Sequence, residues 1–373
     1  MPRRRKPNPP TVLSEPNRKT ALLRTIKLGA LRALQQSGLS ARVRDSRWRK
    51  ERLLILCYHG VAIADEHEWR PRLYMSPAML RERFESLRRG GYQVLPLGEA
   101  VERLYRNDLP PRSVVLTFDD GGFDFYKEAS PILREFGFPA TVYLTTYYSD
   151  FARPIFGLAA SYLLWKRRDA TLQPTQDLGL LSAVDLRSED ARKQVVTDLE
   201  QFAARQSMTG SEKDTLLKRL ARLLGADYDQ LLAQRLLQIM RPQEAAEIAS
   251  AGFDIELHTH RHRTPLDETL FRKEIADNRE RILNASGKTP THFCYPSGHY
   301  EMVFLPWLER EQVQSATTCD PGLATRKSHP LLLPRFVDTP LQPLHVFEAW
   351  LSGVGHLLSA RRPAAGARLS ERR

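Results

Sequence analysis

Short apolar segments alternate with helical segments along much of this chain, and that alternation constrains the fold more than any other feature. Residues 52–61 (RLLILCYHGV) and 113–118 (SVVLTF) have the composition of buried strands. Residues 76–91 begin with Ser-Pro and end with Gly-Gly, as an α-helix commonly does. Residues 126–146 then repeat the order of helix, glycine and strand. Repeated strand–helix–strand units predict a parallel sheet or a barrel.

The repeating pattern is interrupted between residues 148 and 240, where the sequence is mainly helical. It resumes at residues 241–260 with a further helix, glycine and strand. We interpret 148–240 as a helical insertion in one loop of a single α/β domain that spans residues 51–345. Residues 1–50 are predicted to form a basic N-terminal extension. Residues 346–373 are predicted to form a C-terminal helix and a basic, disordered tail.

The N-terminal extension contains two different patterns. Residues 1–18 are rich in proline and charge and are predicted to be disordered. Residues 20–36 (TALLRTIKLGALRALQQ) fit a basic amphipathic helix. A helix of this kind can lie on an anionic membrane surface or pack against its own domain, and amphipathicity alone does not separate the two.

Composition limits the class of protein. The 373 residues carry a formal net charge of +12, but much of the basic excess lies in the two terminal regions. No nucleic-acid-binding module is recognisable, so we expect no nucleic-acid partner. The three cysteines are too few for a disulfide framework, which favours free thiols in a reducing compartment.

The sequence also predicts where the protein resides. No stretch reaches the roughly 18–20 consecutive apolar residues of a transmembrane helix. The N-terminus is positively charged but lacks the apolar stretch and the cleavage site of a signal peptide. We therefore expect a cytoplasmic protein, which residues 20–36 would hold at the inner face of the membrane if they bind lipid.

Polar clusters follow three of the predicted strands. They are residues 58–60 (Tyr-His-Gly), 119–122 (Asp-Asp-Gly-Gly) and 258–262 (His-Thr-His-Arg-His). In parallel α/β folds and barrels, the carboxyl ends of the strands meet at one rim, where functional sites form. We expect these three clusters to meet at such a rim.

The histidine cluster is typical of a metal site. In an extended strand all three histidines would share one face, whereas in a helix or tight turn His258 and His262 would align and His260 would diverge. We favour the second geometry, because Arg263 and Pro265 indicate that the strand has ended. Histidine is the commonest metal ligand in proteins, so the pattern predicts metal binding.

The paired acids Asp119 and Asp120 then distinguish two kinds of metal enzyme. One aspartate with two histidines makes an open site for zinc or another divalent transition ion, and the same ligand set serves non-haem iron oxygenases. An oxygenase needs no second carboxylate beside the ligand, whereas a hydrolase needs one as a general base. A bound cation would also offset the repulsion between the two acids.

Five segments together resemble the polysaccharide deacetylase family (the NodB homology domain, carbohydrate esterase family 4), and in particular its exopolysaccharide branch. They are LILCYHGV (54–61), TFDDG (117–121), HTHRH (258–262), FCYPSG (293–298) and LLLPRFVD (331–338). The resemblance covers about residues 51–340. It implies an α/β fold, a distorted (β/α)7 barrel, here with a helical insertion.

The resemblance also implies residue roles. Asp119 would be the general base, and Asp120, His258 and His262 would bind a divalent metal, zinc first, with cobalt, nickel or iron as alternatives. Many members use a late histidine as the general acid, and His345 stands in a helical pattern that does not match it. In the exopolysaccharide branch the histidine of the opening strand can fill that role, so His59 is the candidate acid.

The third motif departs from the family pattern. Cys294 stands where the family has an arginine that pairs with the base, and we predict that Arg335 supplies this charge instead. No activating arrangement around Cys294 is evident from the sequence, so we do not expect it to be a nucleophile. Tyr295 and Pro296 are candidates for contact with the substrate or its oxyanion, with core packing as the alternative for Tyr295.

The function implied is that of a metal-dependent hydrolase acting on a glycan. It would remove N-acetyl groups from an acetylated amino sugar in a polysaccharide, an oligosaccharide or a lipid-linked precursor. The altered third motif leaves a second hypothesis open, a catalytically degenerate member of the fold that binds glycan without cleaving it.

Overall fold

The computed structural model describes residues 38–359 of the 373-residue chain. The predicted disordered segment 1–18, the predicted amphipathic helix 20–36 and the basic tail from residue 360 lie outside the described residues. Within the described part, no helix combines the length and the apolar character needed to cross a bilayer.

A curled parallel sheet forms the centre of the molecule. Seven strands lie in the order β11-β10-β9-β6-β5-β1-β12, and every pair along this order is parallel. They are β1 (Leu54–Tyr58), β5 (Ser113–Phe118), β6 (Thr141–Leu144), β9 (Asp254–Leu257), β10 (His292–Cys294), β11 (Ser315–Thr317) and β12 (Phe336–Val337). Leu333, three residues before β12, makes a parallel bridge to Thr317 of β11, which brings the two sheet edges together. The predicted distorted parallel barrel is confirmed.

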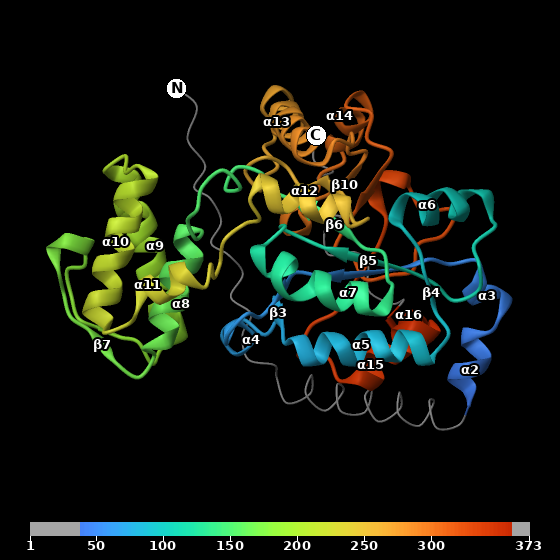
Figure 1. Ribbon diagram of the computed structural model, residues 1–373, viewed down its shortest axis with the longest axis horizontal. Coiled ribbons are helices and arrows are strands. Elements are labelled where there is room, and N and C mark those ends of the chain that lie inside the picture. Colours follow the sequence, from blue (N-terminus) through green and yellow to red (C-terminus); the bar gives the residue numbers. More distant parts are fainter. Residues whose placement is uncertain (1–37, 360–373) are drawn as a thin grey trace, which may run out of the picture.

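Helices cover the outside of the sheet. They include α5 (Pro77–Arg89), α6 (Leu97–Arg106), α7 (Ser130–Phe136), α12 (Pro242–Ser250), α13 (Glu268–Ser286), α14 (Phe304–Arg310), α15 (Leu344–Ser352) and α16 (Val354–Ser359). Figure 1 shows α5 and α7 along one side of the strands and α13 and α14 along another. Ser76 caps α5 as predicted, with its hydroxyl accepting from the Met79 N–H. A short β4 (Gln93–Val94) pairs with β5, and β2 (Gly60–Val61) pairs with β3 (Tyr74–Met75).

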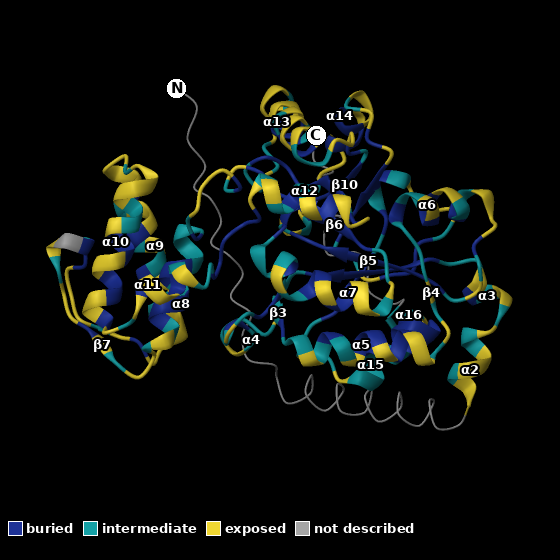
Figure 2. Cartoon of the chain, viewed as in Figure 1, coloured by how far each residue is buried: buried dark blue, intermediate teal, exposed yellow. Residues whose placement is uncertain are grey.

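The two faces of the strands build two different cores. Leu54, Leu56 and Leu116 pack outward against the helices, in the larger apolar cluster. Ile55 and Val115, which alternate with them, point into the barrel. Figure 2 shows the central strands as mostly buried, while the surrounding helices are buried on one side only. The interior becomes polar toward the carboxyl ends of the strands, and the candidate site lies there.

Residues between β6 and α12 form a separate group of helices with their own apolar core. The elements are α8 (Phe156–Lys166), α9 (Glu189–Arg205), α10 (Gly210–Leu224), α11 (Tyr228–Ala233) and the short antiparallel pair β7 (Thr171–Leu172) and β8 (Val184–Asp185). In Figure 1 this helical segment, defined as residues 156–237, lies to the left of the barrel. The chain returns along the barrel rim, where the Phe123 N–H donates to the Gln238 carbonyl (2.8 Å) and the Met240 N–H donates to the Gly121 carbonyl (3.0 Å).

The helices α2 (Leu39–Arg44) and α3 (Arg47–Lys50) belong to the part of the chain that we assigned to the N-terminal extension. Arg49 is nevertheless fully buried. Its guanidinium donates to the carbonyls of Leu351 (3.0 Å) and Ser113 (3.3 Å). Packing against the barrel therefore begins before residue 51.

Candidate active site

The two acids at the end of β5 point in different directions because the backbone turns sharply between them. Asp119 continues the strand, and its N–H donates to the Tyr58 carbonyl (2.9 Å). Asp120 and Gly121 both have φ of 73°, in the left-handed region. A Cβ at Gly121 would come within 2.3 Å of Leu144 Cδ1 and 3.1 Å of its Cα, so only glycine fits there.

Asp119 is buried and paired with an arginine. Its side chain is 3% exposed, and Arg335 Nη1 and Nη2 donate to its two carboxylate oxygens at 2.7 Å each. Arg335 is itself held by the Thr318 carbonyl (2.9 Å) and the Thr117 hydroxyl (3.1 Å). Burial raises the pKa of Asp119, but the Arg335 guanidinium outweighs burial and holds that pKa well below its usual range. Asp119 is therefore ionised, and the predicted contact with Arg335 is present.

Asp120, His258 and His262 meet on the other side of the turn. Asp120 Oδ1 lies 3.2 Å from Nε2 of each histidine, and the three possible ligand atoms lie within 4.8 Å of one another. The Asp120 side chain is 41% exposed, in contrast to its neighbour Asp119. His258 Nδ1 lies 2.9 Å from the Cys294 carbonyl, so it carries the proton and leaves Nε2 as a free ligand atom.

The three histidines divide as the sequence predicted, although the segment is an irregular loop and not a helical turn. Thr259 and His262 have positive φ of 62° and 54°, which folds His262 back beside His258. His260 turns away from both and lies 2.9 Å from the Thr146 hydroxyl. This donor set of one carboxylate and two imidazoles fits a divalent transition ion with open positions.

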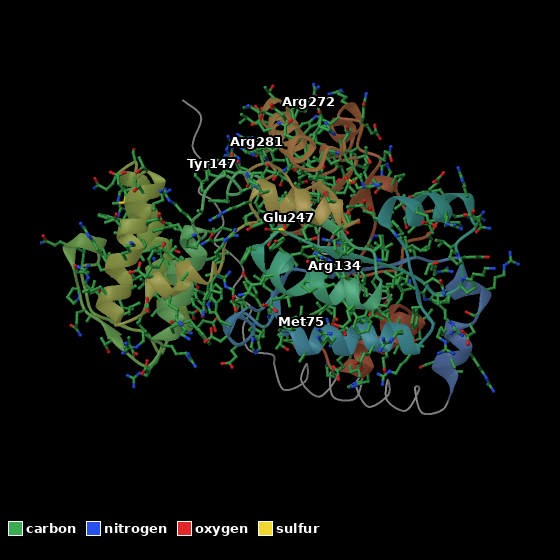
Figure 3. The ribbon with its side chains drawn as sticks, in the orientation of Figure 1. Met75, Arg134, Tyr147, Glu247, Arg272 and Arg281 are labelled. Atoms are coloured by element: carbon green, nitrogen blue, oxygen red, sulfur yellow. The ribbon has the colours of Figure 1, made fainter. Side chains whose placement is uncertain are left out.

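Helix α13 supports the histidine loop with two buried polar residues that the sequence analysis missed. Asn278 accepts from the His258 N–H (2.9 Å) and donates to the Leu144 carbonyl (2.9 Å). Glu274 accepts from the Arg261 N–H (2.8 Å). Arg272 and Arg281, on the exposed face of the same helix, are labelled in Figure 3. A usable signal was present, because Glu274 and Asn278 are polar residues spaced i, i+4 on the face that also carries Phe271, Ile275 and Ile282.

His59 lies across from Asp119, with its Nε2 3.9 Å from Asp119 Oδ2. It stands on the turn between β1 and β2. Asp124 fixes this turn by accepting from the Val61 N–H (2.6 Å), and burial raises the pKa of Asp124 to about 7. Asp124 is a third residue that was not predicted from the sequence, and no motif or periodicity singled it out.

These groups open into a cavity of about 580 Å³ with two chemically different walls. We call the first the polar wall, and it consists of His59, Asp119, Asp120, His258 and His262. We call the second the apolar wall, and it consists of Leu73, Tyr74, Tyr148, Ile155, Leu158, Leu237 and Ile239. Three of these residues belong to or adjoin the helical segment: Leu158 and Leu237 lie near its two ends, and Ile155 directly precedes it. No pattern in the sequence indicated a role for them.

The proposed contacts from Tyr295 and Pro296 are wrong. Tyr295 is fully buried, its hydroxyl donates to the Leu331 carbonyl (3.0 Å), and its N–H donates to the Thr317 carbonyl (3.3 Å). Neither group is therefore free to reach a substrate. Pro296 is also buried, and the neighbouring Ser297, with a positive φ of 57°, lines the cavity instead.

The arginine-paired carboxylate and the Asp-His-His cluster lie together at the carboxyl ends of the parallel strands, and this donor set suits metal-assisted hydrolysis. A family model described as polysaccharide deacetylase matches residues 106–158 and 210–314. In these two parts the chain matches the polysaccharide deacetylase family. The interval between the two matched parts, residues 159–209, lies inside the helical segment.

Two curated relatives match over short stretches. Poly-beta-1,6-N-acetyl-D-glucosamine N-deacetylase of Escherichia coli K12 is 36% identical over 97 residues, which cover 25% of this chain and 14% of that protein. A putative polysaccharide deacetylase of Bacillus subtilis, YxkH, is 31% identical over 94 residues, which cover 25% of this chain and 32% of that protein. The chain thus matches less than a third of the length of either relative.

Solved structures share the fold. The Streptococcus pyogenes deacetylase PplD, in complex with acetate, superposes with a TM-score of 0.53 at 18% identity, covering 84% of this chain and 99% of that one. BC0361, a polysaccharide deacetylase from Bacillus cereus, gives a TM-score of 0.50 at 15% identity, covering 80% and 69%. At these identities the likeness concerns the fold.

Proposed function

We propose that this protein is a metal-dependent hydrolase that removes N-acetyl groups from an acetylated amino sugar within a glycan. The observation that carries the proposal is the placement of the ionised, arginine-paired Asp119 beside the open cluster of Asp120, His258 and His262, both facing one cavity. The match of residues 106–158 and 210–314 to the polysaccharide deacetylase family model supports it.

The three ligands Asp120, His258 and His262 would hold the ion. When bound, a divalent ion would supply Lewis-acid chemistry to the acetamide carbonyl and to a water molecule. Asp119 accepts the proton of the attacking water, because Arg335 keeps it ionised and fixed in orientation. Water adds to the acetyl carbon, the carbon–nitrogen bond breaks, and the products are acetate and a free amine.

The leaving nitrogen needs a proton, and we propose that His59 donates it. Its ring lies in the cavity wall 3.9 Å from Asp119, so the proton acceptor and the proton donor flank the same space. Asp124 holds the turn that carries His59 and is a positioning residue for it. His345 lies on α15, and it does not line this cavity.

The cavity favours a substrate that extends beyond one sugar. A second cavity of about 350 Å³ lies over the helical segment and shares Arg70, Tyr148, Ile155 and Leu158 with the first. The shared residues make one continuous surface from the polar wall to the helical segment. A polysaccharide, an oligosaccharide or a lipid-linked glycan would fit this surface, and the relative named for poly-beta-1,6-N-acetyl-D-glucosamine makes that polymer the first to test.

Acetate release from a panel of N-acetylated glycans tests the proposal, together with measurement of bound metal. Asp119→Asn is expected to keep its metal and to lose about 10²–10⁴-fold in rate, as general-base variants do. His258→Ala is expected to lose both metal and activity. His260→Gln is the matched control, since its ring points away from Asp120, and it is expected to keep the metal.

The outcomes separate the two hypotheses. Normal acetate release by both Asp119→Asn and His258→Ala would contradict the site assignment. Binding of a glycan without acetate release by the metal-loaded wild type, across the whole panel, would favour the glycan-binding alternative.

We also propose that the protein is cytoplasmic and that residues 20–36 hold it at the inner face of the membrane. This proposal rests on the basic amphipathic pattern of that segment. A variant without residues 1–37 should bind vesicles containing anionic lipid less than the full chain does. Equal binding by both would contradict it.

A further inference from the structure

All three cysteines of the chain surround the Asp119–Arg335 pair, although they are far apart in the sequence. Cys57 Sγ and Cys294 Sγ lie 3.5 Å and 3.4 Å from Asp119 Oδ2. Arg335 Nη2 lies 3.0 Å from Cys294 Sγ and 3.6 Å from Cys319 Sγ. The thiols come from β1, from β10 and from the segment after β11, so the closure of the barrel brings them together.

The three thiols differ in access. Cys57 and Cys294 are fully buried, whereas Cys319 is half-buried and lines the catalytic cavity beside His59 and Asp119. A small reagent that enters the cavity therefore meets Cys319 first. Cys57 is its neighbouring thiol, since each of the two thiols shifts the pKa of the other, and Cys57 Sγ lies 3.5 Å from Asp119 Oδ2 in the same cluster.

The surroundings of Cys319 also favour its thiolate. The hydrogen bond with Cys57 lowers the pKa of Cys319 to about 6, burial opposes this, and the Arg335 guanidinium lowers it further. Burial raises the pKa of both Cys57 and Cys294 well above the usual range for a thiol. The accessible cysteine is thus also the nucleophilic one.

We propose that Cys319 is a covalent modification site for peroxides and soft electrophiles, with Cys57 as the resolving thiol that closes a disulfide beside the catalytic carboxylate. With hydrogen peroxide as the oxidant, the Cys319 sulfur forms an S–O bond while the O–O bond breaks. The sulfur is oxidised by two electrons to a sulfenic acid, and the released hydroxide takes the thiol proton to become water.

Cys57 completes the reaction. Its sulfur attacks the Cys319 sulfenic sulfur, the S–O bond breaks and the S–S bond forms, and the Cys57 proton leaves with hydroxide as a second water. Two thiols and one peroxide give one disulfide and two waters. Cys294 is not proposed as the partner, because its thiol is occupied by the Arg335 guanidinium, whose Nη2 lies 3.0 Å from Cys294 Sγ and 3.6 Å from Cys319 Sγ.

The disulfide would draw Cys57 Sγ and Cys319 Sγ to about 2 Å from each other. Cys57 contacts Asp119, and Cys319 contacts Arg335, so both members of the ion pair would lose their present packing. We therefore expect oxidation to abolish acetate release. That readout, unlike the thiol measurements, rests on the proposed deacetylase function.

The test uses the full chain treated with hydrogen peroxide, or separately with iodoacetamide, and analysed by peptide mapping. Iodoacetamide should label Cys319 at least about 10-fold faster than Cys57 or Cys294, in keeping with its thiolate fraction and access. Peroxide should give a peptide linked through Cys57 and Cys319 and an intact mass lower by two hydrogen atoms. Dithiothreitol should restore both thiols and the acetate release.

Two variants make the test specific. Cys57→Ala should stop at the sulfenic acid, which dimedone traps on Cys319. Cys319→Ser should give no linked peptide, and its acetate release, relative to its own untreated rate, should resist peroxide. Equal labelling of the three cysteines, or no Cys57–Cys319 peptide, would overturn the proposal. Because the thiol readouts need no turnover, they succeed or fail independently of the deacetylase function.

Discussion

The two walls of the cavity are built on different principles. Each side chain of the polar wall stands at or just after the end of a parallel strand. Buried partners fix two of them, since Arg335 holds Asp119 and the Cys294 carbonyl holds His258. The apolar wall depends on packing, and part of it comes from a helical segment with its own core. The polar wall is thus preorganised for chemistry, and the apolar wall can change without altering the chemical groups.

This difference predicts that variants of the polar wall change kcat, metal binding or pH dependence, whereas variants of the apolar wall change KM and the choice of glycan.

The largest effect is expected from Arg335→Met. Removing one partner of a buried ion pair commonly costs about 3–5 kcal/mol of stability. In the folded fraction, burial would then raise the pKa of Asp119, with only His59 and His258 left to oppose it. The base works only when deprotonated, so the acidic limb of the pH–rate profile should move to higher pH, with kcat reduced.

Arg335→Lys is the matched control for this prediction. It retains the charge but not the two parallel hydrogen bonds, and it should shift the acidic limb less than Arg335→Met does. Thermal unfolding monitored by circular dichroism separates loss of fold from loss of function. An unshifted profile and full activity in folded Arg335→Met would refute the role of Arg335.

A smaller effect is expected from Asn278→Ala, which removes the support of the histidine loop from α13. Residues behind the metal ligands typically contribute about 10–100-fold to metal affinity. Competition with a chelator should show that loss, and excess metal should recover most of the activity. Asn284→Ala, on the same helix but away from His258, is the control. Unchanged metal affinity in Asn278→Ala would show that the histidine loop keeps its conformation without the hydrogen bond from Asn278.

The apolar wall is expected to give the next effect in size. Leu158→Ala should raise KM for a long glycan by about 5–30-fold, as the loss of about 1–2 kcal/mol of apolar contact implies, with kcat little changed. A short acetylated substrate that does not reach the helical segment should show no difference. Leu181→Ala, at a residue that is 91% exposed, is the control. A fall in kcat with constant KM would mean that the two walls are not functionally separate.

The smallest effect is expected on the stability of the fold, and it concerns Glu256, a buried carboxyl group in the barrel. Burial raises the pKa of Glu256 to about 8 from an ordinary value of 4.5, although the N–H groups of Thr291 and His292 donate to it. The folded chain therefore keeps a proton that the unfolded chain has released, and stability falls as the pH rises from about 4.5 to about 8.

Glu256→Gln removes this titration and keeps an acceptor for both N–H groups. The variant should gain stability relative to wild type as the pH rises from about 5 to about 8, seen as a growing difference in Tm. Glu280→Gln, on the exposed face of α13, should show no such trend. A Tm difference for Glu256→Gln that does not depend on pH would contradict the raised pKa.

The sequence by itself determined the barrel and the polar wall. Strand–helix periodicity is local, and so are the caps at Ser76 and the glycine that follows α7, which is why the elements were predictable. The strands end in chemically distinctive residues, and parallel topology necessarily gathers such ends at one rim. Cys294 stands where the family has an arginine, and this difference indicated that another cation was needed near Asp119. Arg335 makes that contact.

Tertiary structure alone decided the rest. Tyr295 resembles a pocket residue in its motif, but only the closed barrel shows its hydroxyl and N–H already bonded to Leu331 and Thr317. Asn278 and Asp124 act through backbone groups of distant segments, which no sequence pattern encodes. The apolar wall and the thiol cluster arise because residues far apart along the chain converge when the barrel closes and the helical segment returns to its rim. Such contacts depend on three-dimensional distance, whereas periodicity and motifs report only distance along the chain.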